Sequence, residues 1–179
     1  MRLMINKKTK LGFVVLGMII CLAAAVSGSH YSSRPGKAFT SEKSALIYLQ
    51  SQWEALIKST ETAWDTSWNA SIRSKPSNKV VRQKLQLSLS DLRKAEKELR
   101  LLFENHYSEF SPAKQAVLKQ ILANSLAAVQ KREAAIETVL TIQDDSRYLF
   151  DIMKNMPDIS LQADNYLKAA SEQWELLEN

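Results

Sequence analysis

The chain has 179 residues, of which 45% are hydrophobic and 24% charged, which is enough material for one domain with a buried core. Its formal net charge is +5, but six of the 24 basic residues precede Ser41, and the remaining 18 face all 19 acidic residues. Because binding to nucleic acid needs a local excess of cations, this neutral body argues against nucleic acid as a partner.

Residues 1–27 predict a membrane-targeting segment. Arg2, Lys7, Lys8 and Lys10 carry four positive charges with no acid among them, and residues 11–26 then carry no charge at all. This apolar run lies between the roughly 7–15 residues of a signal-peptide core and the roughly 20 residues of a membrane span. Small residues follow it, which favours a cleaved signal peptide and leaves an uncleaved anchor as the alternative. Either one exports the body to the periplasm or to the outer face of the cytoplasmic membrane.

Residues 28–40 read as a linker, and residues 41–179 as one helical domain. All four glycines lie within the first 36 residues, so the body lacks the turn residues that sheets usually require. Prolines at positions 35, 76, 112 and 157 divide the chain into segments of helical length. We therefore expect an all-α fold, an elongated antiparallel bundle of three long helices and a shorter fourth.

The first helix is expected to begin at Thr40 or Ser41, whose hydroxyls can cap the first turn, and to reach about Arg73. On a helical wheel its apolar residues form one stripe.

That stripe contains three tryptophans, at positions 53, 64 and 68. Tryptophan is enriched at the energetic centres of interfaces, but residues that share a stripe with leucine and isoleucine usually belong to the core. We assign Trp53 and Trp64 to the core. Trp68, at the margin of the stripe, is the candidate for contact with a partner.

The second helix is expected to run from Ser77 or Asn78 to Phe110. Its main stripe is apolar, but Val80, Leu87 and Leu101 point nearly the other way. Two apolar sides predict a helix that lies between neighbours, or one that offers its second side to another molecule.

The third helix has a clear start in Ser111 and Pro112. Its apolar stripe keeps its phase across Asp144 and Asp145, which favours one long helix to about Asn155, roughly 66 Å in length. A break near Asp145 is the alternative. The shorter fourth helix is then expected to begin just after the last proline, at position 157.

No pattern of catalytic, cofactor-binding or metal-binding residues is present. Cys21 is the only cysteine, and it lies in the apolar N-terminal run. His30 and His106 are too few for an imidazole site, and neither belongs to an HExxH arrangement. Without glycine the body cannot form a phosphate-binding glycine loop or a nucleophile elbow.

Charged residues within or beside the stripes have structural explanations. Glu96 and Arg132 lie in apolar stripes of consecutive helices, where a structural ion pair or extended side chains are the simplest interpretation. The helical pattern leaves open whether the two residues pair with each other. Glu96 with Glu98, and Asp144 with Asp145, lack a third metal ligand nearby.

The sequence therefore predicts an exported protein without enzymatic activity, cofactor or metal. It would act as a scaffold or through contact with a protein partner or a second copy, using Trp68, Val80, Leu87 and Leu101. The alternative is an extracytoplasmic ligand-binding or sensor bundle, which would need a cavity beside the buried tryptophans.

Overall fold

The protein is described by a computed structural model that covers residues 39–73, 78–142 and 145–178. Four α-helices make up nearly all of it: α2 (Glu42–Arg73), α3 (Lys79–His106), α4 (Pro112–Thr141) and α5 (Asp145–Glu178). A 3-10 turn, η1 (Tyr107–Glu109), connects α3 to α4. These ranges contain no strand, which confirms the prediction of an all-helical fold.

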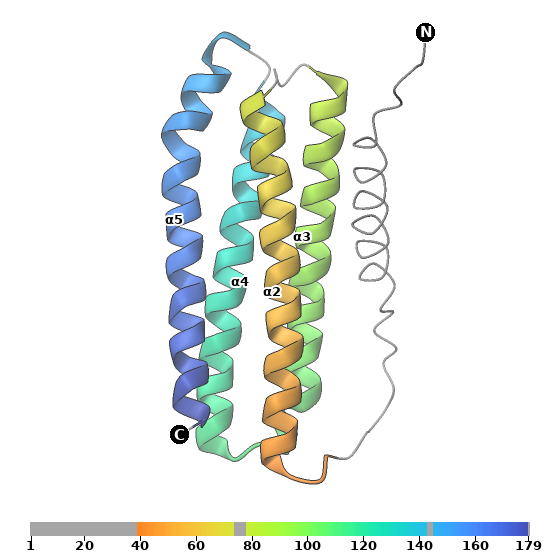
Figure 1. The fold of residues 1–179 in the computed structure, drawn as a ribbon, viewed down its shortest axis with the longest axis vertical. Helices are drawn as coiled ribbons and strands as arrows, with labels where there is room; N and C mark the ends of the chain where they lie inside the picture. Colours follow the sequence, from red (N-terminus) through yellow and green to blue (C-terminus); the bar gives the residue numbers. More distant parts are fainter. Residues whose placement is uncertain (1–38, 74–77, 143–144, 179) are drawn as a thin grey trace, which may run out of the picture. The chain divides into compact units, whose positions relative to one another are not determined.

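The helices are arranged so that successive ones run in alternating directions (Figure 1). The most extensive packing joins α4 to α5 and α2 to α3, and α3 also packs along α4. By contrast, α2 and α5 touch at few points. Of the four pairs of helices that are neighbours around the bundle, α2 and α5 therefore pack together least.

The helix starts follow the predicted capping residues. The Ser41 hydroxyl accepts a hydrogen bond from the Ser44 N–H (3.2 Å), and the Asn78 side chain accepts one from the Val80 N–H (2.9 Å). Such contacts satisfy N–H groups that have no partner within the helix. Ser111 precedes Pro112 as expected, but its side chain makes no capping hydrogen bond.

The prediction of one long third helix from Pro112 to about Asn155 is wrong. Helix α4 ends at Thr141, and Ile142 has an extended backbone with φ −70° and ψ 122°. A new helix begins at Asp145 and packs along α4. Folding back buries apolar residues that a straight extension would have left in solvent, and this gain outweighs unbroken helix geometry.

The prediction of a shorter fourth helix beginning after Pro157 is also wrong. Pro157 lies inside α5, which has 34 residues and is the longest of the four helices. Proline inside a helix removes one hydrogen bond and costs about 3 kcal/mol. Met156 and Ala163, which are 2% and 0% exposed, bury apolar surface on both sides of the proline and offset that cost.

Large aromatic side chains pack together in the core toward the ends of α3 and α5. The Trp174 ring lies 5.7 Å from the ring of Trp53 and 6.2 Å from that of Phe103, centroid to centroid. The Trp53 indole N–H donates a hydrogen bond to the Ser125 hydroxyl at 2.8 Å. This contact ties α2 to α4 across the interior.

The predicted targeting segment, residues 1–27, lies outside the described residues, as does most of the predicted linker. Within the part of the chain that the structure describes, none of the helices combines the length and the apolar character that crossing a membrane requires.

Candidate functional site

Three of the four predicted contact residues lie on the outer face of α3. Val80, Leu87 and Leu101 are 59%, 60% and 47% exposed. These positions recur at intervals of seven residues, and Lys94, which is also exposed, occupies the position between Leu87 and Leu101. Residues seven apart lie on the same side of a helix, so all four share one side of α3. We call these four residues the α3 outer face. Single exposed leucines are ordinary, and Lys94 interrupts this row, but apolar residues that recur at seven-residue spacing on one side of a helix are what a second helix can cover.

Trp68 does not join the α3 outer face. It lies on α2, is half-buried against the core, and lines a groove together with Met156 and Leu161 of α5. Trp53 and Trp64 are each 5% exposed, which confirms their assignment to the core. The structure thus divides the predicted contact residues between two surfaces.

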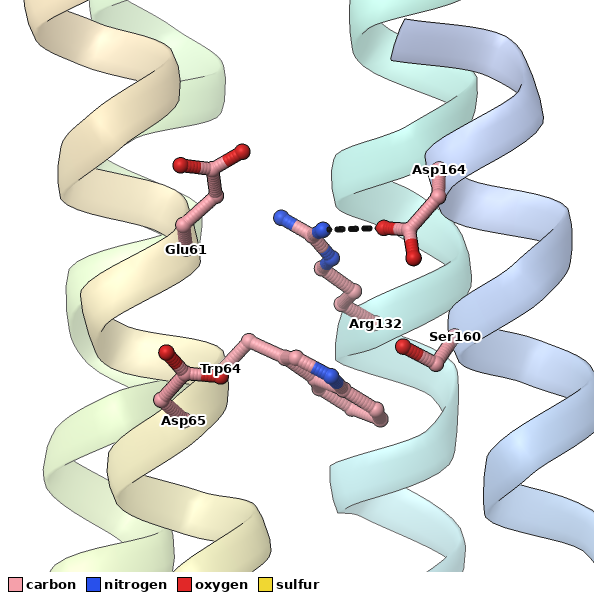
Figure 2. Close-up of a pocket in the computed structure, with 6 residues that line it drawn as sticks. All are labelled: Glu61, Trp64, Asp65, Arg132, Ser160 and Asp164. Atoms are coloured by element: carbon pink, nitrogen blue, oxygen red, sulfur yellow. Dashed lines mark hydrogen bonds and ion pairs between the residues drawn. The ribbon is translucent and has the colours of Figure 1, made fainter. Parts of the chain in front are cut away.

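The groove begins at a buried cation. Arg132 of α4 is 3% exposed, and its Nη2 donates to Asp164 Oδ1 of α5 at 3.0 Å. Its Nη1 lies 3.4 Å from the Thr60 hydroxyl of α2, while its Nε is buried without a hydrogen-bond partner. Figure 2 shows the guanidinium between α2 and α5, with Glu61 opposite Asp164. A half-satisfied guanidinium is stable here because Asp164 supplies the countercharge.

Two connected hollows form what we call the α2–α5 groove. The smaller one, about 200 Å³, reaches Arg132, and the larger one, about 410 Å³, extends over Trp68 and the middle of α5. They share Trp64, Asp65 and Asp164, so the groove is continuous. It is open to solvent along its outer side. Figure 2 shows that Trp64 and Asp65 come from α2 and Asp164 from α5.

A group of carboxylates lies where α3 meets α4. Burial raises the pKa of Glu96, but hydrogen bonds from Arg100 (2.7 Å) and Gln130 (2.8 Å) outweigh it and leave that pKa below its usual value. Burial, helped by the negative charges of Glu96 and Glu137, raises the pKa of Glu133 to about 7. The Oε1 atom of Glu133 is buried without a hydrogen-bond partner. At neutral pH this carboxyl is therefore close to half protonated.

Other polar side chains connect the helix ends. Glu42 at the start of α2 accepts hydrogen bonds from the Ser111 backbone N–H (3.0 Å) and from Lys114 Nζ (3.2 Å). The hydrogen bond from Ser111, followed by that from Lys114, lowers the pKa of Glu42. His106, the last residue of α3, lies 2.9 Å from Glu109 Oε1. These contacts connect the start of α2 to the start of α4, and the end of α3 to η1.

The residues that the structure describes contain no group of three histidine, cysteine, aspartate or glutamate side chains that could hold a metal ion. No protein-family model matches the chain, and no curated protein or solved structure shows significant similarity to it. The function must therefore be inferred from the surfaces themselves.

Sequence reasoning found part of this arrangement. It singled out Arg132 as a charge within an apolar stripe, but left its pairing with Glu96 open. In the structure Arg132 pairs with Asp164, and Glu96 pairs with Arg100. Asp164 was missed because its register against α4 depends on where α5 begins, which the stripe did not reveal.

Proposed function

We propose that this protein is an exported helical bundle without enzymatic activity, elongated and antiparallel, which acts in the cell envelope through contact with another protein. The α3 outer face carries this proposal, because Val80, Leu87 and Leu101 remain exposed in a helix whose other side is fully packed. Apolar residues at a seven-residue spacing suit a second helix laid alongside, in the manner of a coiled coil.

The location of the protein follows from its first residues. Four basic residues followed by an apolar run of sixteen direct the chain into the membrane and leave the cations in the cytoplasm. Alkaline phosphatase fused after Asn179 should be active, since that enzyme forms its disulfides only outside the cytoplasm. An inactive fusion that accumulates to normal levels would refute export.

The contact surface is tested by photo-crosslinking in cells. A photoreactive amino acid replacing Leu87 of the full-length chain should give a defined crosslinked species. The same replacement at Leu176 of α5, which is 70% exposed, serves as the control. Replacing both Val80 and Leu101 by serine should lower the crosslinking yield at position 87 about tenfold. The loss of two apolar contacts removes at least about 1.4 kcal/mol of binding free energy. Equal yields from positions 87 and 176 would count against the proposal.

A second candidate is an extracytoplasmic ligand-binding or sensor bundle. The α2–α5 groove beside Trp64 favours it, because its larger hollow of about 410 Å³ falls within the usual range for small-molecule sites. A ligand present at 100 times its Kd would stabilise the fold by about 2.7 kcal/mol. Thermal unfolding of the full-length protein against a panel of small metabolites measures this directly. A panel without any stabilising compound would remove the reason to keep this candidate.

A further inference from the structure

The larger hollow of the α2–α5 groove combines aromatic walls with carboxylates. Trp64 and Trp68 line it from α2, and Met156 and Leu161 line it from α5. Asp65 and Asp164 stand on opposite helices at its edge, and no lysine or arginine belongs to this lining. The surroundings are therefore apolar at the base and negative at the rim.

The two aspartates differ in whether they form an ion pair. Asp164 has one oxygen engaged by Arg132 at 3.0 Å, and its side chain is still 58% exposed. Asp65 is exposed and forms no ion pair within the described part of the chain. Glu61, one helical turn before Asp65, is also exposed and unpaired there. Arg132 compensates only one of these three charges, so the groove keeps a net negative charge.

Tryptophan side chains beside carboxylates fit one kind of group well. A lysine or arginine side chain presents a cation on an aliphatic stem, which can lie along Trp64 and Trp68 while the charge meets the aspartates. A cation near an indole face gains about 0.5–2 kcal/mol, and the neighbouring carboxylates add to this gain.

The groove's shape decides between a free amine and a protein segment. Small-molecule sites usually enclose most of their ligand. This groove is open along its outer side, and Leu161 on its wall is 60% exposed. A free amine would leave that apolar wall in water, whereas a protein segment would cover it.

We propose that the α2–α5 groove is a docking site for a partner protein that inserts a lysine or arginine side chain between Asp65 and Asp164. The stem of that side chain packs on Trp64 and Trp68, and an adjacent apolar residue of the partner covers Leu161. Arg132 holds Asp164 in place by engaging one of its oxygens. This surface is separate from the α3 outer face, so either one can be disabled without altering the other.

A pair of matched peptides tests the proposal on the full-length protein. The first probe is the capped tripeptide Leu-Arg-Leu, and the second carries citrulline, which has nearly the shape of arginine without its charge. Binding is followed by the tryptophan indole signals in NMR spectra. The arginine peptide should shift the signals of Trp64 and Trp68 and bind about tenfold more tightly than the citrulline peptide, a difference of about 1.4 kcal/mol.

Variants locate the binding. Asp65→Asn should weaken binding of the arginine peptide about tenfold, and Glu61→Gln should weaken it less. Asp91→Asn, an exposed position on α3, is the matched control and should change nothing. Equal binding of the two peptides, or an unaltered affinity in Asp65→Asn, would overturn the proposal. Butylguanidinium binding as tightly as the peptide would also overturn it, because the site would then recognise a small cation rather than a protein segment.

Discussion

The stability of this protein should fall as the pH rises from about 5 to 8, and Glu133 should be the cause. Burial of its carboxyl, with the charge of Glu96 nearby, raises the pKa of Glu133 from 4.5 to about 7. The folded state therefore holds a proton that the unfolded state has already released. Raising the pH through this interval removes that proton, which disfavours the folded state.

The magnitude follows from the size of the shift. At about 1.4 kcal/mol per pKa unit, a rise from 4.5 to about 7 would correspond to roughly 3 kcal/mol. Glu133 is only partly buried, and solvent screening reduces the effect to about 1 kcal/mol. The loss of stability should be complete above about pH 8, and it should be larger at low salt.

Urea unfolding of wild type and Glu133→Gln, followed by circular dichroism at several pH values, measures this effect. Glutamine resembles the protonated acid, so the variant should lose about 1 kcal/mol less than wild type between pH 5 and 8. All other titrating groups are common to both proteins and cancel in the difference. Glu54→Gln, an exposed position on α2, should follow wild type. Parallel pH profiles for wild type and Glu133→Gln would show that the buried oxygen has a partner and that the reasoning is wrong.

Three further changes test the interior by urea unfolding. Asp164→Ala should cost about 1–2 kcal/mol because it leaves Arg132 buried without a countercharge, whereas Arg132→Met should cost less; the reverse order would refute this account of the pair. Ser125→Ala should cost about 1–2 kcal/mol by leaving the Trp53 indole N–H without an acceptor, and an unchanged stability would show that the hydrogen bond contributes nothing. Pro157→Ala should stabilise the protein by about 1–3 kcal/mol, and a loss of stability would mean that the helix does not continue through this residue.

The sequence was sufficient to predict the all-helical class and much of the core, because both depend on local periodicity. The absence of glycine after residue 36 and the regular stripes excluded sheets. Trp53 and Trp64 could be assigned to the core because they share a stripe with leucines. Val80, Leu87 and Leu101 could be placed outside it for the same reason, since a helical wheel fixes which side a residue takes.

The helix boundaries after Thr141 could not be predicted in this way. A stripe can keep its phase through a short interruption, so periodicity does not distinguish one long helix from two that fold back on each other. Pro157 was misleading because the rule that proline begins a helix considers only local cost. Packing of α5 along α4 is a tertiary contribution, and it determined both outcomes. The Arg132–Asp164 pair depends on the same packing and was missed with it.

The buried arginine also explains why the α2–α5 groove exists. Arg132 lies at the level of Thr60 and Asp164, so one layer of the interior between α2, α4 and α5 is polar rather than apolar. Desolvating both partners of an ion pair is costly, and here only Arg132 is buried while Asp164 remains 58% exposed. Helices α2 and α5 therefore do not pack tightly against each other at this level, whereas α4 and α5 pack along each other. A single charged residue in an apolar stripe, visible in the sequence, thus contributes to the opening between α2 and α5 at the level of Thr60 and Asp164, where the groove begins.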